Sequence, residues 1–99
     1  MDNRINLSFC VYVLFSEFDH KIYVGYTKDI DRRFKEHVEG RVISTKFRRP
    51  LKLIFIEYYL NKEDAKYREL YFKTSKGKRM LKLILANTLN NIGYKSPVD

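Results

Sequence analysis

The stretch KIYVGYTKDIDRRFKEH, residues 21–37, changes its pattern halfway along. Residues 21–27 are rich in β-branched and aromatic side chains, which predicts a strand. The apolar residues that follow, Ile30, Phe34 and Val38, recur every four positions and predict a helix with one apolar stripe. A strand that leads directly into a helix indicates an α/β fold.

Before this stretch, residues 9–16 (FCVYVLFS) predict another strand, and residues 17–20 are short and polar enough for a hairpin loop. Ser16 facing Lys21 sets a register with four further pairs on alternating faces: Phe15 with Ile22, Leu14 with Tyr23, Val13 with Val24, and Tyr12 with Gly25. Tyr12 and Tyr23 then become diagonal neighbours, and Gly25 leaves a gap opposite Tyr12. Alternatively, the tyrosines only pack, as good strand residues do.

The rest of the chain predicts one more strand and two more helices. Thr27 or Asp29 caps the first helix and Gly40 ends it. Residues 41–50 form a basic loop, and 51–60 a third strand. A second helix is expected over residues 62–73, capped by Asn61. A third, capped by Thr74 or Ser75, carries one face made of Leu81, Ile84, Leu85 and Thr88. A polar tail follows from about residue 90.

The composition indicates a single domain over residues 1–99 with a basic surface. Lys and Arg number 20 against 12 acidic residues, a formal charge of +8. Such an excess favours nucleic acid as a partner, although a basic surface without a partner is the alternative. Cys10, the single cysteine, is expected to be buried. Without an apolar run of about 18 residues or a signal peptide, the prediction is a cytoplasmic protein that does not enter membranes.

Two polar side chains flank the apolar stripe of the first helix. At helical spacing, Arg33 and His37 lie one turn apart beside Ile30 and Phe34, away from the solvated face. A guanidinium there needs an anion. Its partner is either a carboxylate, such as Glu57 or Glu69, or a phosphate, which Arg binds in bidentate fashion.

The second helix carries one acid on its packing side. Glu69 lies between Ala65 and Phe72, so it is expected either to pair with Lys73 four residues on or to bind Mg²⁺. Two phenols, an Arg, a His and a Glu are thus all predicted to border one face of the sheet, and together they suit phosphodiester hydrolysis. That reaction needs a base, a cation for the phosphate and an Arg for the transition state.

These segments resemble the GIY-YIG nuclease superfamily. The two motif elements are VYV (residues 11–13) and YVG (residues 23–25). YVGYTKDIDRRFKEH, STKFRRPLKLIFIEYY and EDAKYRELYFKTSKGKRMLKL are similar to the rest of the domain in small stand-alone bacterial members. The resemblance covers about residues 8–85. It implies a three-stranded antiparallel sheet flanked by helices in the order ββαβαα.

The resemblance also implies site roles. Tyr12 is the general base or water-orienting phenol, and Tyr23 the second phenol. Arg33 contacts the scissile phosphate, His37 assists the base, and Glu69 binds one Mg²⁺ or Mn²⁺. Water then attacks to leave a 5′ phosphate and a 3′ hydroxyl.

The chain departs from the family pattern in places. Val11 and Val24 stand where the name-giving motifs have Gly and Ile. Tyr26 occupies a position where some branches have Lys, with Lys28 two residues further on. Some branches carry a site Asn after the glutamate, and Asn87, the first Asn there, does not align clearly.

The basic residues predict how DNA is held. Two clusters without acids, over residues 41–52 and 73–82, suit contacts to the phosphate backbone. The residues expected to contact DNA are Lys28, Lys46, Arg48, Arg49, Lys73, Lys76, Lys78 and Arg79. Such contacts give affinity without sequence readout. The prediction is therefore structure-selective cleavage of branched or flapped DNA, as in DNA repair, unless a protein partner supplies targeting. A non-catalytic nucleic-acid-binding module and a protein-interaction scaffold are the alternatives.

Overall fold

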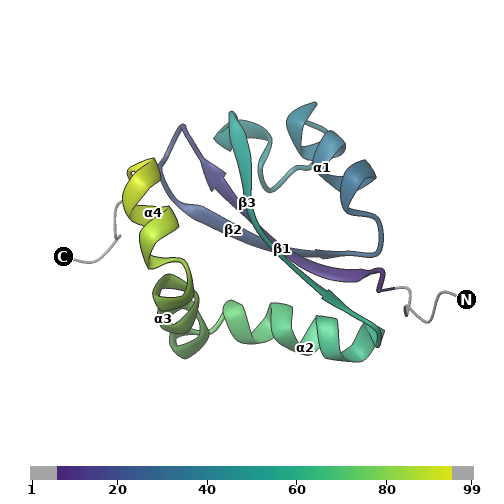
Figure 1. Cartoon of the computed structure of the whole chain (residues 1–99). Coiled ribbons are helices and arrows are strands. Elements are labelled where there is room, and N and C mark those ends of the chain that lie inside the picture. The colour runs from purple at the N-terminus through teal and green to yellow at the C-terminus, as the bar shows by residue number, and fades with distance from the viewer. Residues whose placement is uncertain (1–6, 95–99) are drawn as a thin grey trace, which may run out of the picture.

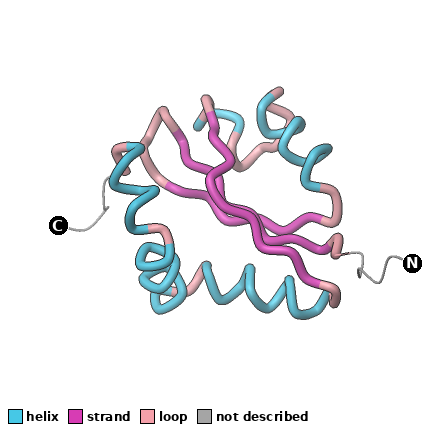
Figure 2. The backbone as a smooth tube through the Cα atoms, viewed as in Figure 1, coloured by secondary structure: helices cyan, strands magenta, loops and turns pink. Residues whose placement is uncertain are grey.

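The computed structural model describes residues 7–94. It contains one three-stranded antiparallel sheet in the order β2-β1-β3, with helices on both faces (Figures 1 and 2). The predicted α/β fold is therefore confirmed. The elements are β1 (Phe9–Ser16), β2 (Ile22–Thr27), α1 (Ile30–Val38), a short 3₁₀ helix η1 (Lys46–Arg48), β3 (Leu51–Tyr59), α2 (Lys62–Phe72), α3 (Ser75–Ile84) and α4 (Ala86–Ile92).

The hairpin has the register that the sequence predicts. Tyr12 faces Gly25, and Leu14 faces Tyr23. On its other side β1 pairs with β3, with an irregularity between Val13 and Leu14. Because β1 is the central strand and is buried on both faces, its sequence is almost continuously apolar.

The two faces of the sheet carry different layers. On one face, Val11 and Val13 pack with Ala65 and Phe72 in a core that α2, α3 and α4 cover. On the other face, Tyr12 and its neighbours pack with Ile30 and Phe34 of α1. Figure 1 shows α1 on one side of the sheet and α2 to α4 on the other. Cys10 is buried as expected, and burial raises the pKa of its thiol to about 11.

Side-chain caps fix where the helices begin. The Asp29 side chain accepts a hydrogen bond from the backbone N–H of Arg32, which satisfies a free donor at the start of α1. Asn61 does the same for α2, and Thr74 for α3. Gly40 follows α1 with φ of +77°, the left-handed conformation that glycine adopts at little cost. The predicted cap Asn61 is thus confirmed. Of the two alternatives for each of the other helices, Asp29 caps α1 and Thr74 caps α3.

The C-terminal helices differ from the prediction. α3 ends at Ile84, and a separate helix, α4, follows and buries Leu89. Because the chain turns at Leu85, Thr88 belongs to another helix, and Ile84 is exposed rather than packed beside Leu81. The helical part also runs through Ile92, beyond the expected start of the tail. Within residues 7–94, no helix is long and apolar enough to cross a membrane.

Candidate active site

Three buried side chains form a hydrogen-bonded chain on the α1 face of the sheet. Tyr12 comes from β1, His37 from α1 and Thr45 from the loop before η1. The Tyr12 hydroxyl lies 2.7 Å from His37 Nε2, and His37 Nδ1 lies 2.7 Å from the Thr45 hydroxyl. Tyr12 and His37, both expected site residues, are thus in direct contact. Thr45 was not predicted, because it lies in a loop without periodicity.

Gly25 leaves the space that the Tyr12 ring occupies. A Cβ at residue 25 would lie 2.4 Å from both Cζ and the hydroxyl oxygen of Tyr12, closer than real Cβ contacts allow. The glycine therefore lets the ring lie over β2, which explains why a strand interior carries a residue that weakens strands.

Tyr23 completes the aromatic cluster at its solvent side. Its ring centroid lies 6.4 Å from that of Tyr12 and 5.4 Å from that of His37. Tyr23 is half-buried, and its hydroxyl accepts a hydrogen bond from the Ser44 side chain at 3.4 Å. Both phenols and the imidazole thus share one site, with Tyr23 the phenol that solvent reaches.

The surroundings keep His37 and Tyr12 in their neutral forms at pH 7. Burial, and then the positive charge of Arg33, lower the pKa of His37 to about 4, against the opposing effect of Glu36. Burial, and then Tyr23, raise the pKa of Tyr12 to about 12, against the opposing effect of Arg33. A neutral imidazole donates from one nitrogen and accepts at the other, which matches a hydroxyl partner on each side.

The buried imidazole makes the stability of the fold depend on pH. Folding favours neutral His37, because its pKa falls from 6.5 in the unfolded chain to about 4. The contribution of neutral His37 to the free energy of unfolding is present in full above pH 6.5 and is lost as the pH falls from 6.5 to 4. We expect the loss to reach roughly 3 kcal/mol of unfolding free energy, at 1.36 kcal/mol per pKa unit. Urea unfolding at several pH values measures it.

The His37→Gln variant is the control for this pH dependence. Its amide does not titrate, so its unfolding free energy should fall less between pH 6.5 and 4. The same fall in both proteins would assign the effect to carboxylates and contradict the prediction.

Arg33 lies at the mouth of this cluster, with 35% of its side chain exposed. Its Nη1 donates to Glu36 Oε1 at 3.0 Å, and its charge acts on the Tyr12 hydroxyl. The prediction that Glu57 or Glu69 pairs with Arg33 is wrong. Glu57 instead binds Arg68, with Arg68 Nε 2.9 Å from its Oε1. Glu36 replaces them because residues three apart on a helix are neighbours.

Glu69 lies on α2, which packs on the face of the sheet opposite Tyr12 and α1, so the prediction that it borders the same face is wrong. Its Oε2 accepts from Lys73 Nζ at 3.0 Å, and 20% of its side chain is exposed. The structure therefore contains the ion pair between Glu69 and Lys73, one of the two expected alternatives. At helical spacing, Lys62, Lys66, Glu69 and Lys73 form one stripe along α2, called here the α2 stripe. Among residues 7–94 no group of three or more His, Cys, Asp or Glu could enclose a metal ion.

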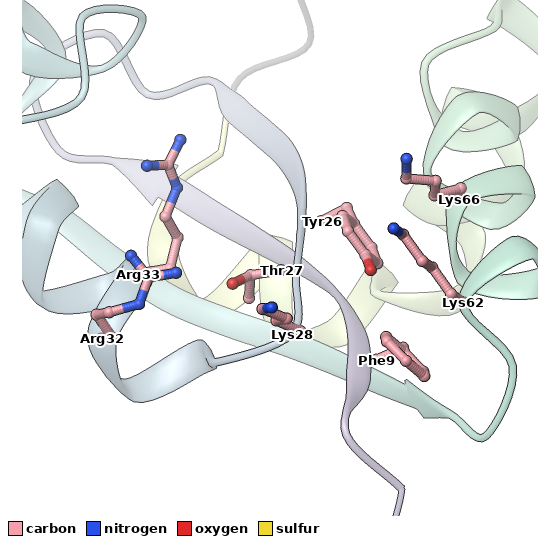
Figure 3. A pocket seen from close by; sticks show the side chains of 8 residues that line it. All are labelled: Phe9, Tyr26, Thr27, Lys28, Arg32, Arg33, Lys62 and Lys66. Atoms are coloured by element: carbon pink, nitrogen blue, oxygen red, sulfur yellow. The ribbon is translucent and has the colours of Figure 1, made fainter.

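A basic hollow connects the two layers at the edge of β2 (Figure 3). Its volume is about 540 Å³. It reaches from α1 past β2 to α2, and every charged side chain that lines it is cationic. The lining residues are Phe9, Tyr26, Thr27, Lys28, Arg32, Arg33, Lys62 and Lys66. The hollow thus leads from Arg33 to the α2 stripe, on which Glu69 lies.

Besides Arg33, Lys28 is the only residue expected to contact DNA that lines the hollow. Tyr26, Arg32, Lys62 and Lys66 were missed as site residues. The spacing of four between Lys62 and Lys66, continued to Glu69, was the signal that could have found the α2 part.

The other predicted DNA contacts divide into engaged and exposed side chains. Arg48 Nε binds Asp19 Oδ2 at 2.6 Å, and Arg49 Nε donates to the carbonyl of Lys46 at 3.0 Å. Both guanidinium groups therefore hold the loop in place. Lys73 pairs with Glu69, and Lys46 is exposed on η1. The other exposed side chains are those of Lys76, Lys78 and Arg79 on α3, in the layer opposite α1. Asn87 is exposed on α4.

Comparison with known proteins identifies a domain family and several relatives. The GIY-YIG catalytic domain matches residues 8–82. UPF0213 protein CPE1444 of Clostridium perfringens is 31% identical over 90 residues, which cover 90% of this chain and 96% of that protein. UPF0213 protein YazA of Bacillus subtilis is 38% identical over 82 residues, 80% of this chain and 83% of that protein. No solved structure matches the chain significantly.

Proposed function

Because the chain belongs to the GIY-YIG catalytic domain family, we propose that it is a metal-dependent endonuclease that hydrolyses phosphodiester bonds in DNA. One observation carries the proposal: a neutral His37 lies 2.7 Å from the Tyr12 hydroxyl, with Arg33 beside it at a hollow lined by cations. This arrangement offers a proton acceptor and an anion site side by side, as hydrolysis of a phosphodiester needs.

Tyr12 and His37 activate the water together. With a pKa of about 12, Tyr12 is not ionised at pH 7, so it cannot accept a proton unless it gives up its own. In the proposed step the Tyr12 oxygen takes a proton from the attacking water while its own proton passes to His37 Nε2. The step requires the tautomer in which Nδ1–H donates to the Thr45 hydroxyl 2.7 Å away, because this tautomer leaves Nε2 free to accept. Tyr23 orients the water from the solvent side.

Arg33 binds the scissile phosphate. Its guanidinium has exposed N–H groups beyond the one that Glu36 accepts, and they can bind two phosphate oxygens. The hollow then receives the flanking phosphates beside Lys28, Lys62 and Lys66, which have no acidic neighbour among the lining residues. Contacts of this kind bind backbone rather than sequence, so selectivity would come from the shape of the DNA.

Glu69 would hold the divalent metal. Mg²⁺ and Mn²⁺ take hard oxygen donors, and Mg²⁺ commonly uses only one or two protein carboxylates, with waters and substrate phosphates completing its shell. A lone, partly exposed carboxylate on the α2 stripe fits that chemistry, provided that Lys73 releases it. When bound, the cation polarises the phosphate and stabilises the leaving oxygen.

The test is cleavage of end-labelled duplex, flapped and branched DNA in Mg²⁺, in Mn²⁺ and in EDTA. We expect metal-dependent cleavage that drops at least about 100-fold in Glu69→Gln, since a catalytic metal contributes several kcal/mol. Asp64→Asn is the matched control, because Asp64 lies on the same helix on the side opposite the α2 stripe. Equal loss in both variants, or cleavage that persists in EDTA, would refute the metal assignment.

A non-catalytic nucleic-acid-binding module remains the second candidate, because the same cationic hollow serves binding alone. It predicts salt-sensitive DNA binding without cleavage by the wild type under any metal.

A further inference from the structure

The loop between α1 and β3 turns two large apolar side chains toward solvent. The backbone N–H groups of Thr45 and Lys46 both donate to the carbonyl of Val42, so the loop coils in successive turns. Val42 and Thr45 point inward and are buried, whereas Ile43 is 90% exposed and Phe47 80% exposed. Ile43 and Phe47 therefore lie four residues apart in one short coiled segment, and both are solvent-exposed. We call this pair the apolar tip.

The loop that carries the apolar tip is firmly anchored. The Ser16 hydroxyl donates to the carbonyl of Arg48 at 2.6 Å, and the Arg48 side chain binds Asp19. Arg49 donates to the carbonyl of Val38, and Thr45 is joined to His37. The exposure of the tip is therefore not a consequence of a loose loop, and a partner would pay little ordering entropy on contact.

The position and charge of the loop indicate what covers the tip. Ser44, between Ile43 and Thr45, donates to Tyr23 of the active site, so the tip lies at the rim of that site. Between Gly40 and Leu51 the sequence has four basic residues and no acid, and of these Arg41 pairs with Glu39 and Arg48 with Asp19. Exposed apolar side chains within a basic surface fit the stacked bases and phosphates of nucleic acid, where apolar wedges open base steps and aromatic rings stack on free bases.

We infer that the apolar tip is a wedge that packs against the exposed base pair at the boundary between duplex and single-stranded DNA. Phe47 stacks on the terminal or first unpaired base, and Ile43 supports the same base step. The anchored loop then holds this boundary at a fixed distance from Tyr23 and Arg33, which would select the phosphodiester bond beside a flap or branch. This inference rests on the proposed nuclease function and gives it a substrate class.

The test compares binding and cleavage of matched flapped and fully paired DNA. We expect Phe47→Ala and Ile43→Ala to weaken binding of the flapped DNA in EDTA about 10-fold, with little change for the paired duplex, since base stacking on an aromatic ring has effects of this size. Phe47→Trp should bind the flapped DNA about as tightly as the wild type, because it keeps an aromatic ring at this position. Tyr67→Ala is the control, because Tyr67 is a similarly exposed aromatic residue, 74% exposed, on the outer side of α2.

Binding in EDTA separates this inference from the proposed function. Selective loss of flap binding by a protein that never cleaves would support the wedge and contradict the nuclease. Wild-type behaviour of Phe47→Ala and Ile43→Ala on every DNA, or equal loss on flapped and paired DNA, would overturn the wedge even if cleavage is confirmed. Unchanged thermal unfolding should accompany every variant, because neither side chain is buried.

Discussion

Replacing Arg33 with alanine is expected to lower the rate of DNA cleavage by about 100- to 1,000-fold, the cost of losing one preorganised donor to a transition-state oxygen. The guanidinium lies at the mouth of the Tyr12–His37 cluster and at the wall of the basic hollow. The charge that develops on the phosphate in the transition state would meet it there. Single-turnover cleavage of flapped DNA in Mg²⁺ measures the chemical step without product release.

The controls separate this role from general charge and from stability. Lys35→Ala removes one positive charge from an exposed position on the same helix, and cleavage should change little. Arg33→Lys should restore only part of the rate, because an ammonium cannot grip two phosphate oxygens as the planar guanidinium can. Arg33→Ala removes a partly exposed ion pair, whose contribution to stability is small. A rate equal to that of Lys35→Ala would contradict the assignment of Arg33.

The sequence predicts best the features that follow from periodicity. Alternation along two strands places Tyr12 opposite Gly25, and the helical step places His37 on the inner side of α1. Both depend only on local geometry and a buried face, and a register slip by one residue would move the whole apolar set to solvent. This is why the positions of Tyr12 and His37 could each be predicted.

Contacts formed by long side chains and loops were less predictable. Glu36 lies on the side of α1 that the helical step assigns to solvent, yet it reaches both Arg32 and Arg33. Thr45 depends on the path of a loop without a repeating pattern. The hollow also depends on how α1 and α2 splay at the edge of β2, which no single segment determines.

The missed helix α4 has a physical reason as well. Its sequence, ANTLNNI, contains four residues of low helix propensity, and its side chains give no cap. It is held by tertiary contacts of Leu89, buried with Leu81 and Leu85. Packing of this kind overrides local propensity and cannot be recognised from a seven-residue segment alone.

Replacing Gly25 with alanine should damage fold and site together. The new Cβ would meet the Tyr12 ring at 2.4 Å, and the ring has little room to move because it is buried and bound to His37. We expect a loss of about 1–3 kcal/mol of unfolding free energy, typical of overpacking a core. Under conditions where the variant is fully folded, cleavage should still be about 100-fold slower, the scale of losing general-base catalysis. Urea unfolding and single-turnover cleavage measure the two effects.

A double-mutant cycle with Tyr12→Leu shows whether the ring is the cause. Tyr12→Leu removes the atoms that the new Cβ would meet, so Gly25→Ala should cost much less stability in that background than in the wild type. The coupling energy between the two substitutions should then account for most of the 1–3 kcal/mol expected from overpacking. Equal costs in both backgrounds would place the strain elsewhere in β2. Gly25 would then serve the strand itself rather than the position of the Tyr12 phenol.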